Sequence, residues 1–420
     1  MPSTLTVRQV TSRDDWNRLR PLWNELLLRS SSPTVFLTFE WLTTWWDCVA
    51  GPSASLFILV VEREGAIVGL APMMKVHERV LGIPFRKIQF ISMMREAAHP
   101  SNVAGQLDII GAAGDEESID AIFSYLSEQE HNWDYMEFHP VPEDSTTLRW
   151  FESEGRTHTI SHLSRRVFET HILQVQGTWT EYLAANKHHL HKVKRQAEKP
   201  QSCVYGLHVS QFGAVGEIPG GFETLLDIER RSWKWESGIS LNSTFYRGFY
   251  RQLAENLSGS GMLKLYLLVF NGNPIAYTYL VQFANVLWGL KMSHDEAHRT
   301  RGPGTYLMYH VLRDIHEQGL SALDMLWGEE QYKVSTMNSR KQYRELFVFN
   351  DSMRGKLSAA YFRAHLLHRS FRRAQDISRR LARKMGIRSS SSELTREDQV
   401  GKESGDGNWR KNNDRVLGQP

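Results

Sequence analysis

Hydrophobic positions near the start of the chain repeat at helical spacing. Apolar residues recur every three or four positions between Trp16 and Leu27, and Pro21 is expected to kink or restart that helix. A second segment, residues 36–49, places three tryptophans on one helical face. Faces rich in tryptophan are more often core than ligand cages, so we predict core-forming helices here.

Two later segments have the pattern of β-hairpins. Residues 56–74 form two apolar runs joined by a short turn at Gly65, and residues 263–281 repeat the arrangement around Gly272. Glycine after a polar residue is the usual signal of a tight hairpin turn. We therefore predict antiparallel strands at both places.

The surroundings of the two hairpins are alike. Each follows a tryptophan-bearing helical stretch, and each precedes a strand that ends near an acidic residue, at 133–140 and 322–329. One αβ unit used twice predicts two related domains, residues 1–170 and 171–350. We expect mixed α/β domains with mostly antiparallel, partly splayed sheets.

The end of the chain differs in composition from the rest. Residues 351–388 carry eleven basic side chains against two acidic ones, whereas the preceding body is mildly acidic. Apolar positions recur at near-helical spacing over 357–385, which predicts a basic amphipathic helix over 351–386. This helix either attaches to an anionic membrane or packs on the acidic body. Residues 387–420 lack apolar periodicity and are expected to be disordered.

Composition excludes several classes of protein. The chain has 420 residues, 41% hydrophobic and 23% charged, which is typical of a globular protein. Only Cys48 and Cys203 are present, too few for a disulfide scaffold or an iron–sulfur cluster, and we expect a cytoplasmic protein that does not bind DNA. His188, His189 and His191 lack nearby carboxylates and adjoin lysines, so no metal site is predicted.

A glycine-bearing junction in the second repeat carries the chemical signal. After the predicted strand at 285–292, the sequence R-x-x-G-x-G ends in Gly302 and Gly304 and leads into a predicted helix at 305–319. Glycines let the backbone approach a phosphate, and the unpaired N–H groups and dipole of a helix N-terminus favour negative charge. The junction therefore predicts an anion site.

Two arginines strengthen this prediction. Arg299 and Arg301 supply cationic donors for a pyrophosphate, and Pro303 suits the first turn of a helix. The glycine spacing is shorter than a dinucleotide-binding fingerprint. Residues 75–133, the corresponding part of the first repeat, contain no such motif. We expect the first repeat to be a scaffold or a wall of the substrate site.

The order hairpin, strand, R-x-x-G-x-G, helix and strand resembles the GNAT superfamily of N-acetyltransferases. The tandem arrangement is similar to the FemAB-like branch, and to the CelD-like acetyltransferases associated with cellulose and exopolysaccharide synthesis. The stretches that carry the resemblance are FLTFEWLTTWW, EGAIVGLAPM, ERRSWKWESGIS, NPIAYTYLV, RGPGTYLMYHV and LDMLWGEEQYKVSTMN. They span roughly residues 10–350.

The resemblance implies an acyltransferase that moves an acyl group from acyl-coenzyme A to an amine or hydroxyl. The glycine loop would hold the coenzyme A phosphates, and the strand before it would pair with the pantetheine arm. The residues expected to bind coenzyme A are Arg299, Arg301, Gly302, Gly304, Met292 and Ser293.

The resemblance also implies catalytic residues. Tyr332 and Lys333 match a tyrosine–lysine pair near the reaction centre, and Tyr332 is expected to protonate the thiolate. Glu329 follows Gly328 at a strand end, where a carboxylate can face the cleft. The candidates for the base, in order of preference, are Glu329, Glu330, then Glu229, His294 and Asp295.

Trp233, Lys234 and Glu229 are expected to line the acceptor site, where an indole face suits a sugar ring. Two other functions stay open. FemAB-like enzymes that use aminoacyl-tRNA suggest an aminoacyl transferase, and the basic helix suggests a non-catalytic adaptor at a membrane. The intact glycine motif favours acyl-coenzyme A, because an aminoacyl-tRNA has no pyrophosphate to bind.

Overall fold

The computed structural model describes residues 5–80, 82–93, 104–153, 161–187, 190, 193, 195, 206–236, 240–328, 333 and 336–365. The chain forms two compact units, Met1–Ala360 and Tyr361–Pro420. Of the second unit only residues 361–365 are described, and they are helical. Most of the predicted basic helix and all of the predicted disordered tail therefore lie outside the described residues.

The first half of the large unit is built around the first hairpin. Its elements are β1 (Leu5–Val10), α1 (Arg13–Arg18), α2 (Arg20–Leu28), α3 (Phe39–Val49), β2 (Ala54–Arg63), β3 (Ala66–Val80), β4 (Ile83–Phe90), β5 (Ile110–Gly111), α4 (Glu116–Glu128), β6 (Tyr135–Pro142), α5 (Thr146–Ser153) and β7 (Ser161–Gln174). The predicted restart at Pro21 is confirmed, because α2 begins with this proline in its first turn. Trp41 and Trp45 are buried, as expected for a core face.

The second half repeats this plan. Its elements are α6 (Trp179–Ala185), β8 (Leu207–Phe212), α8 (Ile218–Arg230), the short 3-10 helix η5 (Trp233–Glu236), α9 (Thr244–Gly259), β9 (Leu263–Phe270), β10 (Asn273–Phe283), β11 (Val286–His294), the 3-10 helix η6 (Glu296–Arg301), α10 (Pro303–Glu317), β12 (Ala322–Asp324) and β13 (Ser339–Phe349). Both predicted hairpins are present, as β2–β3 and β9–β10.

The two hairpin turns have the same backbone. Glu64 and Gly65 have φ of 53° and 81°, and Asn271 and Gly272 have φ of 50° and 79°. Positive φ at both central residues defines the turn whose twist matches that of the flanking strands. The glycine adopts this conformation without the steric cost of a side chain.

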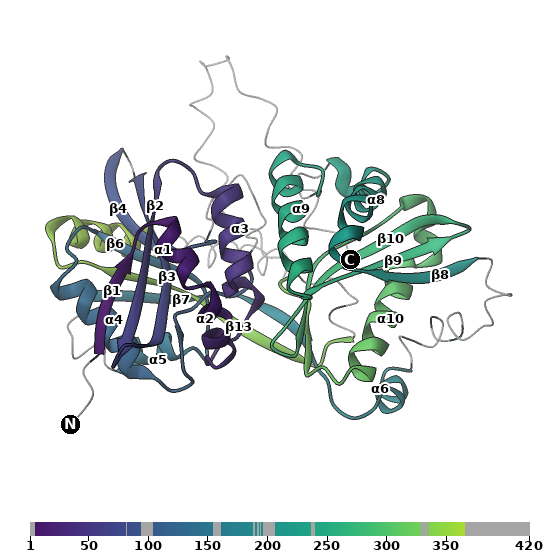
Figure 1. The fold of residues 1–420 in the computed structure, drawn as a ribbon, viewed down its shortest axis with the longest axis horizontal. Helices are drawn as coiled ribbons and strands as arrows, with labels where there is room; N and C mark the ends of the chain where they lie inside the picture. Colours follow the sequence, from purple (N-terminus) through teal and green to yellow (C-terminus); the bar gives the residue numbers. More distant parts are fainter. Residues whose placement is uncertain are drawn as a thin grey trace, which may run out of the picture. The chain divides into compact units, whose positions relative to one another are not determined.

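The halves share one mixed sheet. The strand order is β1-β2-β3-β4-β6-β13-β7-β12-β11-β10-β9-β8, with β5 paired to β3 (Figure 1). The last strand of the first half, β7, pairs with β12 of the second half, and β13 pairs in turn with β6 of the first. Each half thus lends a strand to the other, and the domain boundary predicted at residue 170 falls inside β7.

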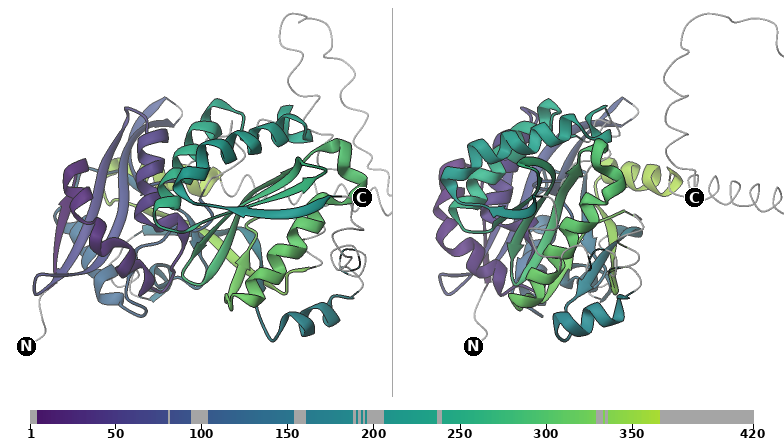
Figure 2. Two further views of the ribbon diagram at one scale, coloured as in Figure 1. Left: turned by 45° about the vertical axis from the view of Figure 1, so that its right-hand side comes forward. Right: turned by 90° about the vertical axis from the view of Figure 1, so that its right-hand side faces the viewer.

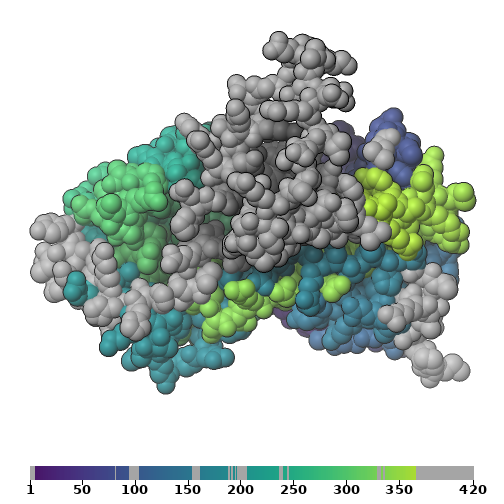
Figure 3. Space-filling view, turned by 180° about the vertical axis from the view of Figure 1, so that it is seen from behind, coloured from purple at the N-terminus to yellow at the C-terminus, as the bar shows by residue number. Residues whose placement is uncertain are grey.

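The exchanged strands also show at the surface. β13 is partly exposed over its first residues and buried over its last five. In Figure 3 lime-green atoms, the colour of β13 and of the residues that follow it, border the blue atoms of the first half.

Helices cover both faces of the second half of the sheet. α8 and α9 lie on one face and α10 on the other (Figure 2). Tyr277 and Tyr279 of β10 belong to the core formed with α8 and α9, whereas Ala276 and Leu280 belong to the core formed with α10. Alternate residues of one strand therefore mark the two faces.

The helices that precede the two hairpins pack on each other. The Trp41 ring on α3 lies 5.4 Å from the Phe249 ring on α9, and Asn256 donates a hydrogen bond of 2.7 Å to the hydroxyl of Thr44. This contact joins the halves at a second place besides the sheet. Within the described part of the chain, no helix is long and apolar enough to cross a membrane.

Candidate functional site

The R-x-x-G-x-G motif joins two helices. Asp295 caps η6 by accepting from the Ala297 amide at 2.9 Å, and η6 ends at Gly302, which has φ of 66°. Gly302 is also the N-cap of α10, and no side chain caps this helix start. The first amides of an uncapped helix have no intrahelical acceptor, so those of Gly304 and Thr305 suit an anion.

A cavity of about 270 Å³ lies at this helix start. Its walls come from the end of β11, Arg299 of η6, the first turns of α10 and two residues of other segments. The lining residues are Leu190, Met292, His294, Arg299, Gly302, Pro303, Gly304, Thr305, Met308, Tyr309, Leu312 and Thr336. The structure thus brings together four of the six residues predicted to bind coenzyme A.

The glycines leave open space beside the backbone. A Cβ built on Gly302 would meet no atom within 4 Å, and one on Gly304 would meet only Met292 Cε at 3.7 Å. Arg299 is 77% exposed and only 3.8 Å from Glu296, an ion pair that costs little to exchange for a phosphate. These residues fit a phosphate group of coenzyme A.

Arg301 and Ser293 do not line this cavity. The guanidinium of Arg301 lies 4.5 Å from the centre of the Phe270 ring. Ser293 is buried and pairs with Tyr277 across the sheet, so it faces α8 instead of α10. Met292 packs against the core formed with α10, which lies on the same face of the sheet as the cavity.

The sheet opens beside the cavity. β11 and β12 are parallel neighbours only from Val286–Ala322 to Trp288–Asp324. Beyond Asp324 the chain turns away at Leu326, which has φ of 59°, and the Asp324 carboxylate accepts from the Leu326 amide at 2.7 Å. Burial raises the pKa of Asp324 to about 6. The described ladder between β11 and β12 thus ends at Trp288, before the last residues of β11.

The face of the sheet opposite the cavity carries a buried carboxylate. Glu229 of α8 is 1% exposed and accepts a hydrogen bond from the Tyr277 hydroxyl. Burial raises the pKa of Tyr277 well above its ordinary value, and the charge of Glu229 adds to the effect. Tyr277 therefore stays protonated and holds the carboxylate in place.

Two lysines lie near this carboxylate. The Lys291 ammonium is 4.5 Å from the Tyr246 ring centre and 5.4 Å from that of Tyr250. Lys234 donates to the backbone carbonyl of Met292. Residues predicted separately for the acceptor and the cofactor, Lys234 and Met292, are thus in contact.

The remaining candidates lie outside the described residues, are engaged by structural partners, or are exposed. Tyr332, Glu329 and Glu330 lie outside the described residues, as do His188, His189 and His191. Lys333 is buried and donates to the Trp327 carbonyl at 2.6 Å. Asp295 caps η6 and accepts from Arg231 at 2.7 Å, so its carboxylate has structural partners. Trp233 is 57% exposed.

His294 lines the cavity and has both acidic and basic neighbours. Burial lowers its pKa, and its Nε2 lies 3.6 Å from Glu296. A neutral imidazole at this point is available as a proton acceptor at neutral pH. His294 therefore keeps its place among the base candidates.

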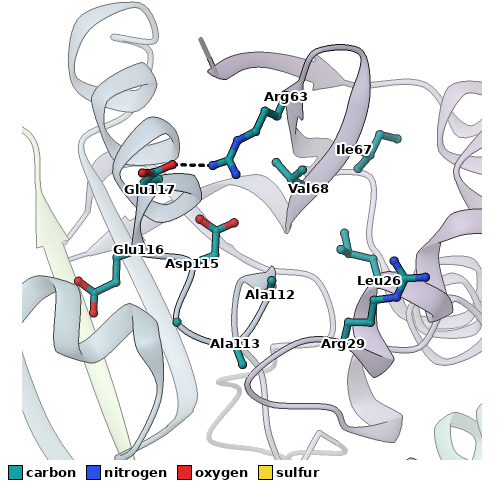
Figure 4. Close-up of a pocket in the computed structure, with 11 residues that line it drawn as sticks. Leu26, Arg29, Arg63, Ile67, Val68, Ala112, Ala113, Asp115, Glu116 and Glu117 are labelled. Atoms are coloured by element: carbon teal, nitrogen blue, oxygen red, sulfur yellow. Dashed lines mark hydrogen bonds and ion pairs between the residues drawn. The ribbon is translucent and has the colours of Figure 1, made fainter. Parts of the chain in front are cut away.

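The first half has a different surface at the equivalent helix. α4 follows β4 and β5 and precedes β6, as α10 follows β11 and precedes β12. Asp115 caps α4 by accepting from the Ser118 amide at 3.1 Å, and Glu116 and Glu117 occupy its first turn. A cavity of about 550 Å³ lies here, with these acidic residues at its wall (Figure 4). Capped amides and negative charge do not suit a phosphate.

Sequence reasoning missed three residues of the site. Lys291 and Tyr277 sit within apolar strands, where a lone polar residue gives little signal until its neighbours are known. Asp324 also lies within an apolar strand. An aspartate in a buried strand is costly to bury, so its presence could have indicated a functional or structural role. Asp324 ends the described ladder between β11 and β12, Tyr277 donates to Glu229, and the charge of Lys291 interacts with that of Glu229.

Comparison with known proteins agrees with this picture. Residues 188–334 match the family model described as Acetyltransferase (GNAT) domain. FemX has a similar structure, with a TM-score of 0.54 and 10% identity over 82% of this chain and 97% of that one. A conserved protein of unknown function from Bacteroides thetaiotaomicron has a TM-score of 0.49 and 13% identity, covering 83% of this chain and 100% of its own.

A third structure, the C-terminal domain of a putative lysylphosphatidylglycerol synthetase from Agrobacterium fabrum, has a TM-score of 0.47 and 10% identity, with coverage of 82% and 96%. No curated protein matches the sequence. The second half of the chain thus carries a GNAT domain, and the fold is that of FemX. The family model confirms the predicted resemblance to the GNAT superfamily over residues 188–334, and the similarity to FemX is one of fold.

Proposed function

We propose that this protein is an acyltransferase that takes its acyl group from acyl-coenzyme A. The observation that carries the proposal is the uncapped start of α10, where Gly302, Gly304 and Arg299 line one cavity with Met292. Bound acyl-coenzyme A supplies an activated thioester there. The chain would contribute amides for the phosphates and the end of β11, beyond its ladder with β12, for the pantetheine arm.

An aminoacyl-tRNA donor is the competing hypothesis, because FemX has the same fold. The open space beside Gly302 and Gly304 favours coenzyme A, since a helix start of this kind binds a compact diphosphate. The resemblance to CelD-like proteins extends the proposal to an acceptor in cell-envelope polysaccharide synthesis. The acceptor is an amine or hydroxyl that attacks the thioester.

Thermal unfolding with acetyl-coenzyme A tests the donor. A ligand at about 100 times its Kd stabilises a fold by about 2.7 kcal/mol, so a rise in Tm of several degrees is expected. Gly304→Glu should abolish most of the rise, because its side chain fills the space beside the helix start and carries negative charge. Gly248→Glu is the matched control, since Gly248 is exposed on α9 with no atom within 4 Å of a Cβ.

Failure of acetyl-coenzyme A to raise the Tm of the unmodified protein would contradict the proposal. A rise of equal size in Gly304→Glu would place the binding site elsewhere. If aminoacyl-tRNA raises the Tm and acetyl-coenzyme A does not, the competing hypothesis is favoured.

A further inference from the structure

One carboxylate oxygen of Glu229 has no hydrogen-bond partner in the part of the chain that the structure describes. Oε1 accepts from the Tyr277 hydroxyl, whereas Oε2 has no hydrogen-bond partner among the described residues. The side chain is 1% exposed. Burial of a carboxylate oxygen without a partner costs free energy, so the fold retains a group that stability alone would remove.

Glu229 is flanked by Lys291 of β11 and Tyr277 of β10. The charge of Lys291 on β11 interacts with that of Glu229, and Tyr277 of β10 donates to the carboxylate. Lys234 of η5 and the rings of Tyr246 and Tyr250 on α9 surround Lys291. The pKa of Lys291 is lowered to about 8. Burial is the main cause, the charge of Lys234 acts in the same direction, and the charge of Glu229 opposes both. At neutral pH Lys291 is therefore mainly protonated beside the carboxylate.

This cluster is connected to the donor cavity through Met292. The Met292 side chain lines the cavity, and its carbonyl accepts from Lys234. Its neighbours Lys291 and Ser293 face the opposite side, where Ser293 pairs with Tyr277. Met292 therefore lies between the cluster on one face of β11 and the donor cavity on the other.

We propose that Glu229 is the catalytic base, that Tyr277 positions it, and that the acceptor is a hydroxyl or an uncharged amine. This inference rests on the proposed acyltransferase function. The acceptor's oxygen or nitrogen bonds to the acyl carbon as the carbon–sulfur bond breaks. Its proton passes to Glu229 Oε2, and the sulfur leaves as a thiolate that takes a proton from solvent.

The local charge decides the class of acceptor. Two lysines and one carboxylate sum to a net positive charge, which disfavours an alkylammonium in the same place. An alkylammonium would also have to lose one proton before attack and another afterwards. The exposed Trp233 ring, 5.8 Å from the Lys234 ammonium, offers a face on which a sugar can stack. A sugar hydroxyl fits these features.

Release of thiol from acetyl-coenzyme A tests the base, with water as the acceptor. The unmodified protein should release thiol at a rate that rises with pH and then levels. Glu229→Gln should lower the rate by about 100-fold or more while the rise in Tm with acetyl-coenzyme A persists. Tyr277→Phe should move the rising limb to higher pH, because the carboxylate loses a hydrogen-bond donor.

Glu223→Gln is the matched control, since Glu223 lies on the same helix in an exposed ion pair with Arg251. Its rate should be unchanged. A rate retained in Glu229→Gln, or no thiol release by a protein that does bind acetyl-coenzyme A, overturns the assignment of the base. Methyl glucoside should accelerate release more than ethylamine does at pH 7, and an equal or smaller effect overturns the acceptor class.

A titration of Lys291 tests the cluster without coenzyme A. Its pKa, measured from the pH dependence of amine labelling by mass spectrometry, should be near 8 in the unmodified protein and lower in Glu229→Gln. An unchanged value in the variant would show that the two groups are not coupled and would overturn the proposed cluster. If acetyl-coenzyme A fails to bind while this shift is present, the donor proposal fails and the cluster stands.

Discussion

The burial of Lys291 lowers the free energy of unfolding of the protein. Its pKa of about 8 in the folded state lies below the ordinary 10.5, mainly because of burial. The folded state therefore disfavours the charged form, and this unfavourable contribution is complete below pH 8. The Lys291 ammonium is held against the rings of Tyr246 and Tyr250, 4.5 Å and 5.4 Å from their centres.

Replacing Lys291 by methionine should stabilise the protein. At pH 7 the free energy of unfolding is expected to rise by on the order of 1–3 kcal/mol, because the buried charge is removed. The gain should shrink between pH 8 and 10.5, where the folded protein already carries a neutral lysine. Urea unfolding at pH 7 and pH 10.5 measures both values, and a destabilised variant at pH 7 would contradict the prediction.

The turn of the β9–β10 hairpin requires residues that can adopt positive φ. Asn271 and Gly272 both have positive φ, and a Cβ on Gly272 would meet no neighbour, so the cost of a side chain there is purely conformational. Gly248 of α9 also has open space around it but lies within a helix. Replacement of glycine by alanine should therefore lower the stability of the protein in the turn and raise it in the helix.

Gly272→Ala is expected to destabilise the protein by about 1–2 kcal/mol, the cost of a left-handed conformation for an L-residue. Gly248→Ala should stabilise it by about 0.5–1 kcal/mol, because alanine loses less conformational entropy in a helix. Denaturant midpoints of the two variants provide the comparison. Equal effects would show that the turn does not require positive φ.

The exchanged strands make the two halves depend on each other. β7 of the first half pairs with β12 and β13, and β13 also pairs with β6. A half expressed alone loses a central neighbour and exposes strand edges, which favours aggregation. The similar local sequences of the two hairpins therefore do not make two independent domains.

A fragment of residues 1–205 and one of residues 206–420 should each fail to unfold cooperatively, whereas the two expressed together should associate. The intact chain should unfold in a single transition by circular dichroism and by tryptophan fluorescence. Co-purification of the fragments and their urea curves check this. Two stable, monomeric fragments with sharp transitions would contradict the prediction.

Several residues of the candidate site could be predicted because their backbone conformation depends only on their own residue type and their neighbours in the sequence. The turns at Gly65 and Gly272, the restart of the helix at Pro21 and the helix start at Gly302 follow from conformational preferences of single residues. Arg299, Gly304 and Met292 were assigned to one site from their order along the chain, and the cavity contains all three. Arg301 and Ser293 show the limit, since one stacks on Phe270 and the other faces α8.

The sequence by itself determined the repeated unit, the elements and the half that has a phosphate-type helix start, because periodicity, turn residues and glycine spacing act over a few residues. Tertiary structure decided which strands each half lends to the other, and it placed Glu229, Tyr277 and Lys291 together across α8, β10 and β11. Those contacts join segments tens of residues apart, and nothing in the local pattern of any one of them specifies its partner.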